Sequence, residues 1–256
     1  MLNLFLFLWT ARWHLRSHNP LASSSSVFLG APSPPPPPPF TIEVCKFSEL
    51  VAVSNLCIDN FFSPNLTPWK LAQTSFLRAE QLKDLQSRFY NELNEMYVAL
   101  SGDNEIVGFV EITARKFGLG DGLEPTSDSS SSSSPSSPFA GINNRNRPVV
   151  SNLVVKKSFR RFGVARNLMV SCETLVNNNS AWRAYSEIVL QVEDENLIAR
   201  RFYEASGYEV LFRDPSCRRY DADGLFLRNV RTTKLCLRKK LRSSIFTRLT
   251  QPWFLS

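Results

Sequence analysis

Two low-complexity stretches divide this chain and restrict the part of it that can fold. Six consecutive prolines occupy Pro34–Pro39, and a serine-rich stretch runs from about Gly118 to Arg147, with six consecutive serines at Ser129–Ser134. A proline run is a stiff extended spacer, and a serine- and proline-rich stretch buries too little apolar surface to fold. The expected parts are a disordered leader and spacer at residues 1–40, one folded domain at 41–240 with a disordered insertion at 118–147, and a tail at 241–256.

The leader has the composition of an organelle transit peptide. The first acidic residue is Glu43, and it is preceded by Arg12, Arg16 and the serine run Ser23–Ser26. A serine-rich, acid-free and weakly basic N-terminus is typical of transit peptides. A secretory signal is the competing interpretation, because Leu2–Trp9 is an apolar stretch of suitable length, but no basic residue precedes it and no small-x-small cleavage site follows closely. We expect a plastid (chloroplast) location, with the mitochondrion as the alternative.

Composition excludes several classes of site. Both histidines, His14 and His18, lie in the leader, so the expected domain has no Ser-His-Asp or Cys-His catalysis and no histidine-ligated metal. The five cysteines include no C-x-x-C pair, so we expect small core residues in a reducing compartment and no metal cofactor. No run approaches the roughly 20 apolar residues of a membrane-spanning helix, so we expect a soluble protein without a membrane partner.

The charge balance favours an anionic ligand. The formal net charge is +7, which suits nucleic acid but equally suits a nucleotide cofactor. No recognised nucleic-acid-binding motif accompanies this charge, so we expect no nucleic-acid partner.

Hydrophobic periodicity within the expected domain predicts a mixed α/β sheet. The expected strands are Thr41–Phe47, Met96–Leu100, Glu105–Thr113, Pro148–Val155, Glu187–Val192, Tyr208–Arg213 and Lys234–Arg238, and the expected helices are Ser48–Phe62, Leu71–Asn91, Arg161–Val176 and Asn196–Ser206.

The segment Val154–Ala165 has the pattern of a phosphate-binding turn. An apolar strand ends, a turn rich in lysine and arginine follows, and a helix starts at about Gly163. Glycine lets backbone N–H groups approach a ligand closely, and the free N–H groups and dipole of a helix N-terminus favour an anion. Neither the Walker pattern nor G-x-G-x-x-G is present.

Three motifs together resemble those of a known family. Arg160, Gly163 and Ala165 form R-x-x-G-x-A, which is similar to the [Q/R]-x-x-G-x-[G/A] signature of the GNAT superfamily of N-acetyltransferases. Upstream, Asn152–Val155 resembles the N-L-x-V end of that family's fourth strand. Downstream, Asn196–Tyr208 matches N-x-x-A-x-x-x-Y-x-x-x-G-[FY]. With the transit-type leader, the chain resembles the plastid protein acetyltransferases of plants.

The resemblance implies a single GNAT-like domain whose mixed, mostly antiparallel sheet of about seven strands is flanked by about four helices and splayed between the fourth and fifth strands. Acetyl-CoA would be the co-substrate, with its pantetheine arm in the splay and its pyrophosphate on the turn. The implied cofactor-binding residues are Leu153, Val154, Val155, Arg160, Arg161, Phe162, Gly163, Val164, Ala165, Arg166, Asn196 and Tyr203. Tyr203 would also protonate the departing thiolate as general acid.

The acceptor and the general base are less constrained. The strand before the turn has no acidic residue, which leaves Glu111, Glu193 or a water chain as candidate bases. An α-amine needs less help from a base than a lysine does. We therefore expect protein N-termini as acceptors, with lysine as a second activity.

The segments 61–70 and 213–231 are expected to shape the acceptor site. The alternatives are an aralkylamine or polyamine acetyltransferase and a non-catalytic acyl-CoA sensor.

Overall fold

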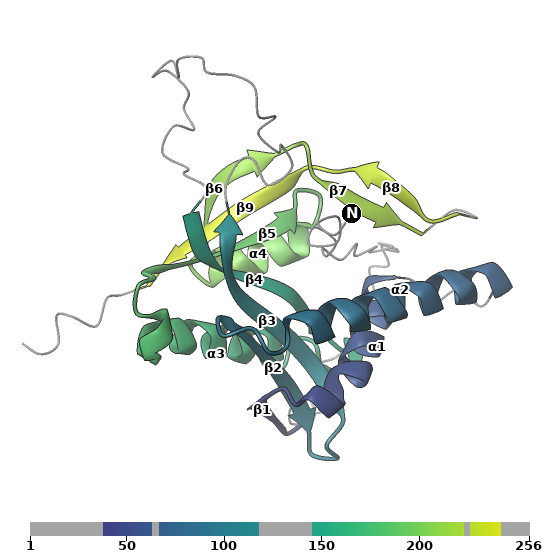
Figure 1. Cartoon of the computed structure of the whole chain (residues 1–256), viewed down its shortest axis with the longest axis horizontal. Helices are drawn as coiled ribbons and strands as arrows, with labels where there is room; N and C mark the ends of the chain where they lie inside the picture. The colour runs from purple at the N-terminus through teal and green to yellow at the C-terminus, as the bar shows by residue number, and fades with distance from the viewer. Residues whose placement is uncertain (1–37, 63–66, 118–144, 223–225, 242–256) are drawn as a thin grey trace, which may run out of the picture.

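The computed structural model describes residues 38–62, 67–117, 145–222 and 226–241 (Figure 1). Most of the expected leader, most of the serine-rich insertion and most of the expected tail lie outside these residues. The elements are β1 (Phe40–Val44), α1 (Leu50–Phe61), α2 (Pro68–Arg88), β2 (Asn94–Ser101), β3 (Ile106–Phe117), β4 (Arg145–Val155), α3 (Val164–Asn178), β5 (Glu187–Glu193), α4 (Leu197–Ala205), β6 (Glu209–Asp214), β7 (Arg218–Asp221), β8 (Arg228–Arg231) and β9 (Lys234–Lys240).

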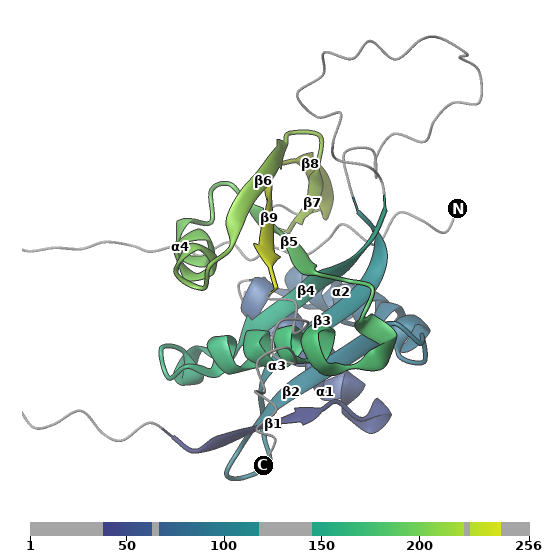
Figure 2. The ribbon, with the colours of Figure 1, turned by 90° about the vertical axis from the view of Figure 1, so that its left-hand side faces the viewer.

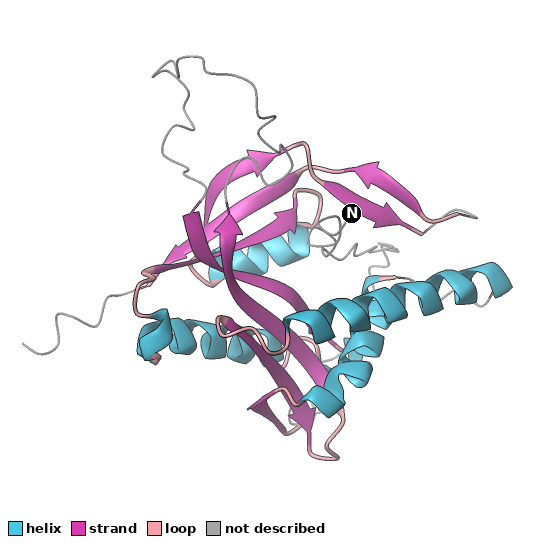
Figure 3. Ribbon diagram, in the orientation of Figure 1, coloured by secondary structure: helices cyan, strands magenta, loops and turns pink. Residues whose placement is uncertain are grey.

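Seven strands form one mixed sheet in the order β1-β2-β3-β4-β5-β9-β6, and β7 and β8 form a separate hairpin (Figure 3). β4 and β5 are parallel, whereas the other neighbouring strands of the sheet are antiparallel. The predicted fold class, a mixed and mostly antiparallel sheet of seven strands with four helices, is confirmed for the described residues.

The helices cover both faces of the sheet. In Figure 2, α3 lies in front of the strands β2 and β3, and α1 and α2 lie behind them. The buried residues of α3 recur at helical spacing and pack into a core that also takes residues of β3, β5 and β9. The core on the opposite face is built from α1, α2, β2 and β3, with Leu50, Leu85 and Phe109 fully buried. α4 joins the α3 side of the sheet, because Tyr203 packs in the same core as Leu235 and Leu237.

β4 and β5 pair over a short distance and then separate. Their paired residues are Val149 with Val189 and Val150 with Leu190, although β4 continues to Val155 and β5 to Glu193. Over the same residues β4 stays paired with β3, where the register shifts at a bulge that includes Asn152, whose φ is +55°. Asparagine tolerates this left-handed conformation better than most residues do. The predicted splay between the fourth and fifth strands is confirmed.

Most element boundaries shift by a few residues from the sequence prediction, and three differences have a clear physical reason. β4 starts at Arg145, inside the expected insertion, because residues 145–147 pair with the end of β3. α2 starts at Pro68 rather than Leu71, since proline is well suited to the first turn of a helix. The expected loop at residues 213–231 contains the hairpin β7–β8, whose strands are four residues each and rich in arginine, so they lack the apolar alternation that marks a strand.

The five cysteines are free thiols, and all are buried, as expected for small core residues. Within the described residues, no helix combines the length and the apolar character needed to cross a membrane, and no group of three or more potential ligand side chains is arranged to hold a metal ion.

Candidate active site

The turn before α3 presents backbone donors to solvent. Gly163, with φ of +85°, is the residue before the helix, and the first helical bond runs from Asn167 N–H to its carbonyl at 3.0 Å. The N–H groups of Val164, Ala165 and Arg166 therefore have no acceptor among the described residues, and no side chain caps this end. Such an end attracts an anion.

Gly163 also leaves room for a ligand. A Cβ built at this position would have no heavy atom within 4 Å, apart from its immediate neighbours in the chain. Arg161, two residues earlier, is held at φ of +72°, which is unusual for a side chain of this size. Arg161, Phe162 and Arg166 are exposed around the helix end. The predicted pyrophosphate-binding turn therefore has the open space, free donors and positive charge that it needs.

Arg160 is placed differently from the other predicted turn residues. Its Nε donates to the Val155 carbonyl at 3.0 Å, and its Nη2 donates to Asn60 Oδ1 at 3.0 Å. Burial lowers the pKa of Arg160 to about 10. These contacts join the end of α1 to the end of β4, so this side chain supports the turn from the inside.

The edge of β4 beyond the splay retains backbone groups for a ligand. Lys156 N–H donates to Val107 of β3 at 2.8 Å. Backbone groups of successive residues point to opposite neighbours, so the N–H and carbonyl of Val155 point toward the gap beside β5. The Val155 carbonyl already accepts a hydrogen bond from Arg160 Nε, whereas the Val155 N–H points into the gap. Leu153 and Val155 are half-buried, and Val154 is buried on the α1 side.

Tyr203 of α4 has a buried ring and an unbonded hydroxyl. The ring packs edge-on against Phe202 and Tyr208, with centroids 5.2 and 5.8 Å away. Its hydroxyl forms no hydrogen bond with any described residue. Burial raises the pKa of the Tyr203 phenol above its ordinary value, so the group stays protonated at neutral pH. A protonated hydroxyl without a protein partner is suited to donate to a ligand.

Asn196 acts as the N-cap of α4. Its Oδ1 accepts a hydrogen bond from Ala199 N–H at 3.1 Å, and the side chain is buried. This is one of the two roles predicted for the residue, and it fixes the start of the helix that carries Tyr203.

The two predicted general bases are each bound to an arginine. Glu111 of β3 is fully buried, and Arg88 Nε donates to its Oε1 at 2.7 Å. Glu193, at the end of β5, is 3% exposed, and its Oε1 lies 3.6 Å from Arg219 Nε of β7. Both carboxylates belong to the sheet face opposite α3. Arg88 and Arg219 were not singled out from the sequence. Each pairs through tertiary packing with a residue more than 20 positions away, and no local motif marks such a pair.

The comparisons with known proteins agree with this geometry. The model of the acetyltransferase (GNAT) family matches residues 64–208, more than half of the chain. The chain belongs to the GNAT acetyltransferase family. It is therefore an acetyltransferase, and acetyl-CoA is its co-substrate. The observed turn, splay and helix order fit that co-substrate.

Solved structures of other proteins share the fold at low identity. Arabidopsis thaliana NAA60, in complex with a bisubstrate analogue, is 13% identical with a TM-score of 0.50, and the match covers 80% of this chain and 100% of that one. A GNAT acetyltransferase from Streptococcus pneumoniae is 12% identical, with a TM-score of 0.49 and coverage of 80% and 100%. Spermidine/spermine N-acetyltransferase SpeG from Vibrio cholerae is 13% identical, with a TM-score of 0.44 and coverage of 78% and 92%. A comparison with curated proteins finds no significant match.

Proposed function

We propose that this acetyltransferase modifies protein amines, with the α-amine of protein N-termini as the favoured acceptor and lysine ε-amines as a second. The pairing of Glu111 with Arg88 and of Glu193 with Arg219 is the observation that carries this proposal. Each carboxylate is already bound by a guanidinium, so neither is free to take a proton from an incoming amine. The acceptor must then reach the site as a largely neutral amine.

The two acceptor classes differ in the free energy that they need to lose a proton at pH 7. A lysine with its ordinary pKa near 10.4 costs about 4–5 kcal/mol to be neutral at pH 7, whereas an α-amine near 7.7–8.0 costs about 1 kcal/mol. Water can remove the remaining proton from an α-amine without a dedicated base. A site whose carboxylates are occupied by arginines therefore favours N-termini.

The reaction follows from the positions of the chain's own groups. The free N–H groups at the start of α3 hold the pyrophosphate of acetyl-CoA, and the N–H of Val155 pairs with its pantetheine arm in the gap between β4 and β5. The acceptor nitrogen attacks the thioester carbonyl directly, so the new C–N bond forms as the C–S bond breaks. Tyr203 donates its proton to the departing sulfur, and the amine loses its extra proton to water.

The hairpin β7–β8 supports a polypeptide acceptor over a polyamine. Its two strands carry Arg218, Arg219, Arg228 and Arg231 against a single acid, Asp221. A polyamine is a cation and would be repelled by this excess of positive charge. α2 and the hairpin extend toward the same side of the molecule in Figure 1, and the exposed side chains of Trp69 and Phe76 on α2 offer apolar surface to a peptide.

We propose a plastid location from the composition of the leader, with the mitochondrion as the alternative. Its acid-free, serine-rich composition is that of a transit peptide, and the likeness to plastid protein acetyltransferases of plants rests on it together with the acetyltransferase motifs. A fluorescent fusion of residues 1–45 should accumulate in plastids of plant cells. Accumulation in mitochondria would support the alternative, and fluorescence in the secretory pathway would contradict both.

One assay tests the acceptor class. The full chain is incubated with acetyl-CoA and with peptides that have free or blocked N-termini, each with or without an internal lysine, and separately with spermidine and an aralkylamine. We expect the highest kcat/KM on free N-termini and slower transfer to lysine in the blocked peptides. Acetylation of spermidine or the aralkylamine alone would overturn the protein-acceptor proposal. Binding of acetyl-CoA without transfer to any acceptor would indicate a sensor.

A further inference from the structure

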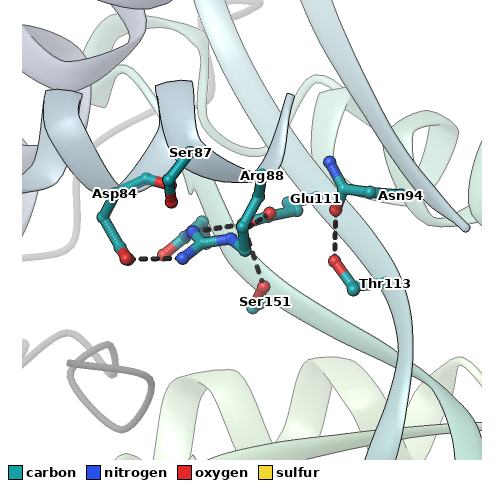
Figure 4. Close-up of polar contacts among 8 residues, drawn as sticks. Asp84, Ser87, Arg88, Asn94, Glu111, Thr113 and Ser151 are labelled. Carbon is teal, nitrogen blue, oxygen red and sulfur yellow. Dashed lines mark hydrogen bonds and ion pairs between the residues drawn. The ribbon is translucent and has the colours of Figure 1, made fainter. Parts of the chain in front are cut away.

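A buried polar network joins the end of α2 to β3 and β4. Arg88, the last residue of α2, binds the Glu111 carboxylate with two nitrogens: Nε is 2.7 Å from Oε1 and Nη2 is 3.0 Å from Oε2. Its third nitrogen, Nη1, lies 2.5 Å from Asp84 Oδ2, one turn earlier on α2. Figure 4 shows the Arg88 guanidinium between these two carboxylates. Arg88 is thus held on both sides in a fixed orientation.

The same carboxylate holds two successive residues of β4. Ser151 Oγ donates to Glu111 Oε2 at 3.3 Å, and Asn152 Nδ2 donates to the same oxygen at 2.8 Å. Glu111 therefore accepts hydrogen bonds from α2 and from β4 at once. Ser151 and Asn152 immediately follow Val150, the last residue of β4 that pairs with β5. The network is attached to β4 at the point where the gap for the cofactor begins.

The hydrogen bonds that Glu111 accepts fix the Asn152 amide. Both Glu111 oxygens accept hydrogen bonds from Arg88, and although burial opposes the cation, the charge of Glu111 and these bonds raise the pKa of Arg88. An ionised carboxylate accepts hydrogen bonds but donates none. Asn152 must therefore turn Nδ2 toward Glu111 and Oδ1 away from it, where Oδ1 is buried and has no partner among the described residues. These contacts therefore fix the orientation of the Asn152 side chain.

We propose that Arg88 and Glu111 are positioning residues for acetyl transfer, which act by holding Asn152 and thereby the mouth of the gap between β4 and β5. The bulge at Asn152 decides where β4 leaves β5, and the cofactor arm lies along the edge exposed there. Because Arg88 belongs to α2, the network also ties the helix pair on the acceptor side to the cofactor gap. This inference rests on the proposed place of the pantetheine arm, and it does not depend on which amine is acetylated.

A purely structural ion pair would behave differently when both partners are replaced. Exchanging a buried pair for apolar residues of similar volume is often neutral for stability. In R88M/E111L the helix keeps an apolar contact with the sheet, but Asn152 loses its acceptor. We expect a lower thermal midpoint, because the buried Asn152 Nδ2 is left without an acceptor, and an affinity for CoA lowered about tenfold in calorimetric titrations of the full chain. Parental CoA affinity in the folded variant would show that the pair does not position the cofactor gap.

A second variant tests the link if that double variant does not fold. Asn152→Gly keeps the left-handed backbone accessible and removes the side chain, and it leaves the pair Arg88–Glu111 and the Ser151 contact intact. We expect weaker CoA binding, again by about tenfold, at near-parental stability. Unchanged CoA affinity in this variant would overturn the proposal.

A mutant cycle then asks whether the pair Arg88–Glu111 acts through Asn152. R88M/E111L and Asn152→Gly should each weaken CoA binding, and the triple variant should be no weaker than the worse of the two, because both remove the hydrogen bond between Glu111 and Asn152. Additive losses would mean that the pair and Asn152 act independently. Arg78→Met is the matched control, since Arg78 of α2 pairs with Asp59 of α1 at 2.6 Å, on the exposed side of the helix pair. Its CoA affinity should equal that of the parent.

The CoA measurements separate this inference from the proposed acceptor class. They need no acceptor, so they keep their meaning if proteins are not the substrate. In turnover with any accepted amine, the Asn152→Gly variant should show a raised KM for acetyl-CoA with the acceptor KM little changed. Equal changes in both KM values would indicate general loosening of the domain instead.

Discussion

Gly108 of β3 lies directly beneath Val164, the first residue of α3. A Cβ at position 108 would stand 2.9 Å from Val164 Cγ1 and 3.1 Å from both Ala99 Cβ and Leu168 Cδ1. Cβ atoms essentially never come within 3.0 Å of another heavy atom, so a side chain at position 108 would force Val164 at the start of α3 to shift. The distance of the predicted pyrophosphate-binding turn from the sheet therefore depends in part on the absence of a side chain at position 108.

Replacing Gly108 with alanine should lift the start of α3. Overpacking of this kind costs about 1–3 kcal/mol, and the displaced N–H groups should bind CoA less tightly. Thermal unfolding and CoA titration measure the two effects. Val164→Ala, added to Gly108→Ala, should recover part of both losses because it removes the clashing methyl groups. If the double variant is as impaired as the sum of the single variants, the two positions are not in contact.

Replacing Gly163 with alanine should weaken CoA binding more than it weakens the fold. A residue with a side chain at φ of +85° costs about 1–2 kcal/mol of stability, and no protein atom stands in the way of the new methyl group. That methyl group would instead occupy the space where the pyrophosphate approaches. Gly207→Ala is the matched control, since Gly207 has φ of +86° and a Cβ there would meet only Lys239 Cε, at an ordinary contact distance of 3.7 Å. Both variants should lose similar stability, and Gly163→Ala alone should lose CoA affinity.

Tyr203→Phe should lower kcat while leaving CoA affinity and stability near parental values. The hydroxyl forms no hydrogen bond with the described residues, so its removal breaks no contact within them. Loss of a general acid typically lowers the rate by about 10²-fold or more. Steady-state kinetics, CoA titration and thermal unfolding on one preparation provide the measurement. An unchanged kcat would exclude Tyr203 as the acid.

The same tyrosine predicts the alkaline side of the pH profile. A general acid works in its protonated form and is lost as the pH rises through its pKa. Burial raises the pKa of Tyr203 above its ordinary value, which is about 10. With both substrates saturating, kcat should therefore show no decline due to this group up to about pH 9.5. A fall in kcat centred near pH 8 that disappears in Tyr203→Phe would contradict the raised pKa.

Arg219→Leu should affect the acceptor more than the cofactor. Arg219 joins the hairpin β7–β8 to Glu193 at the end of β5, so its loss should loosen the hairpin from the sheet. A loss of about 1 kcal/mol in acceptor binding would raise the acceptor KM about fivefold, with CoA affinity unchanged. Arg228→Leu serves as control, because Arg228 pairs with Asp221 inside the hairpin. Equal acceptor KM values in the two variants would remove the proposed role of the hairpin anchor.

The turn before α3 and the start of α4 were predictable because their signals are local. Gly163 ends a basic turn, the apolar residues of α3 recur at helical spacing, and Asn196, Tyr203 and Gly207 keep a fixed spacing along one short helix. Each of these features depends on residues a few positions apart. The fold followed from the same kind of pattern, since most strands and helices are strongly periodic.

The contacts of Glu111 and Arg160 were not predictable to the same depth, because they are long-range. Glu111 alternates with Val110 and Ile112, and its neighbours along the strand do not show that Arg88 binds it from a helix 23 residues away. The sequence also does not distinguish Arg160, which turns inward to Asn60, from Arg161, which stays exposed. The strands of the hairpin β7–β8 have too few apolar residues to be recognised as strands.

The short pairing between β4 and β5 divides the sheet into two blocks of strands, and the boundary between β4 and β5 is called the seam. β1 to β4 form one block and β5, β9 and β6 the other, and their backbones meet at two residue pairs before they part. The proposed pantetheine arm would contact both blocks there, and a ligand that binds only the folded state stabilises it. We therefore expect the resistance of this enzyme to unfolding to rise with the concentration of acetyl-CoA.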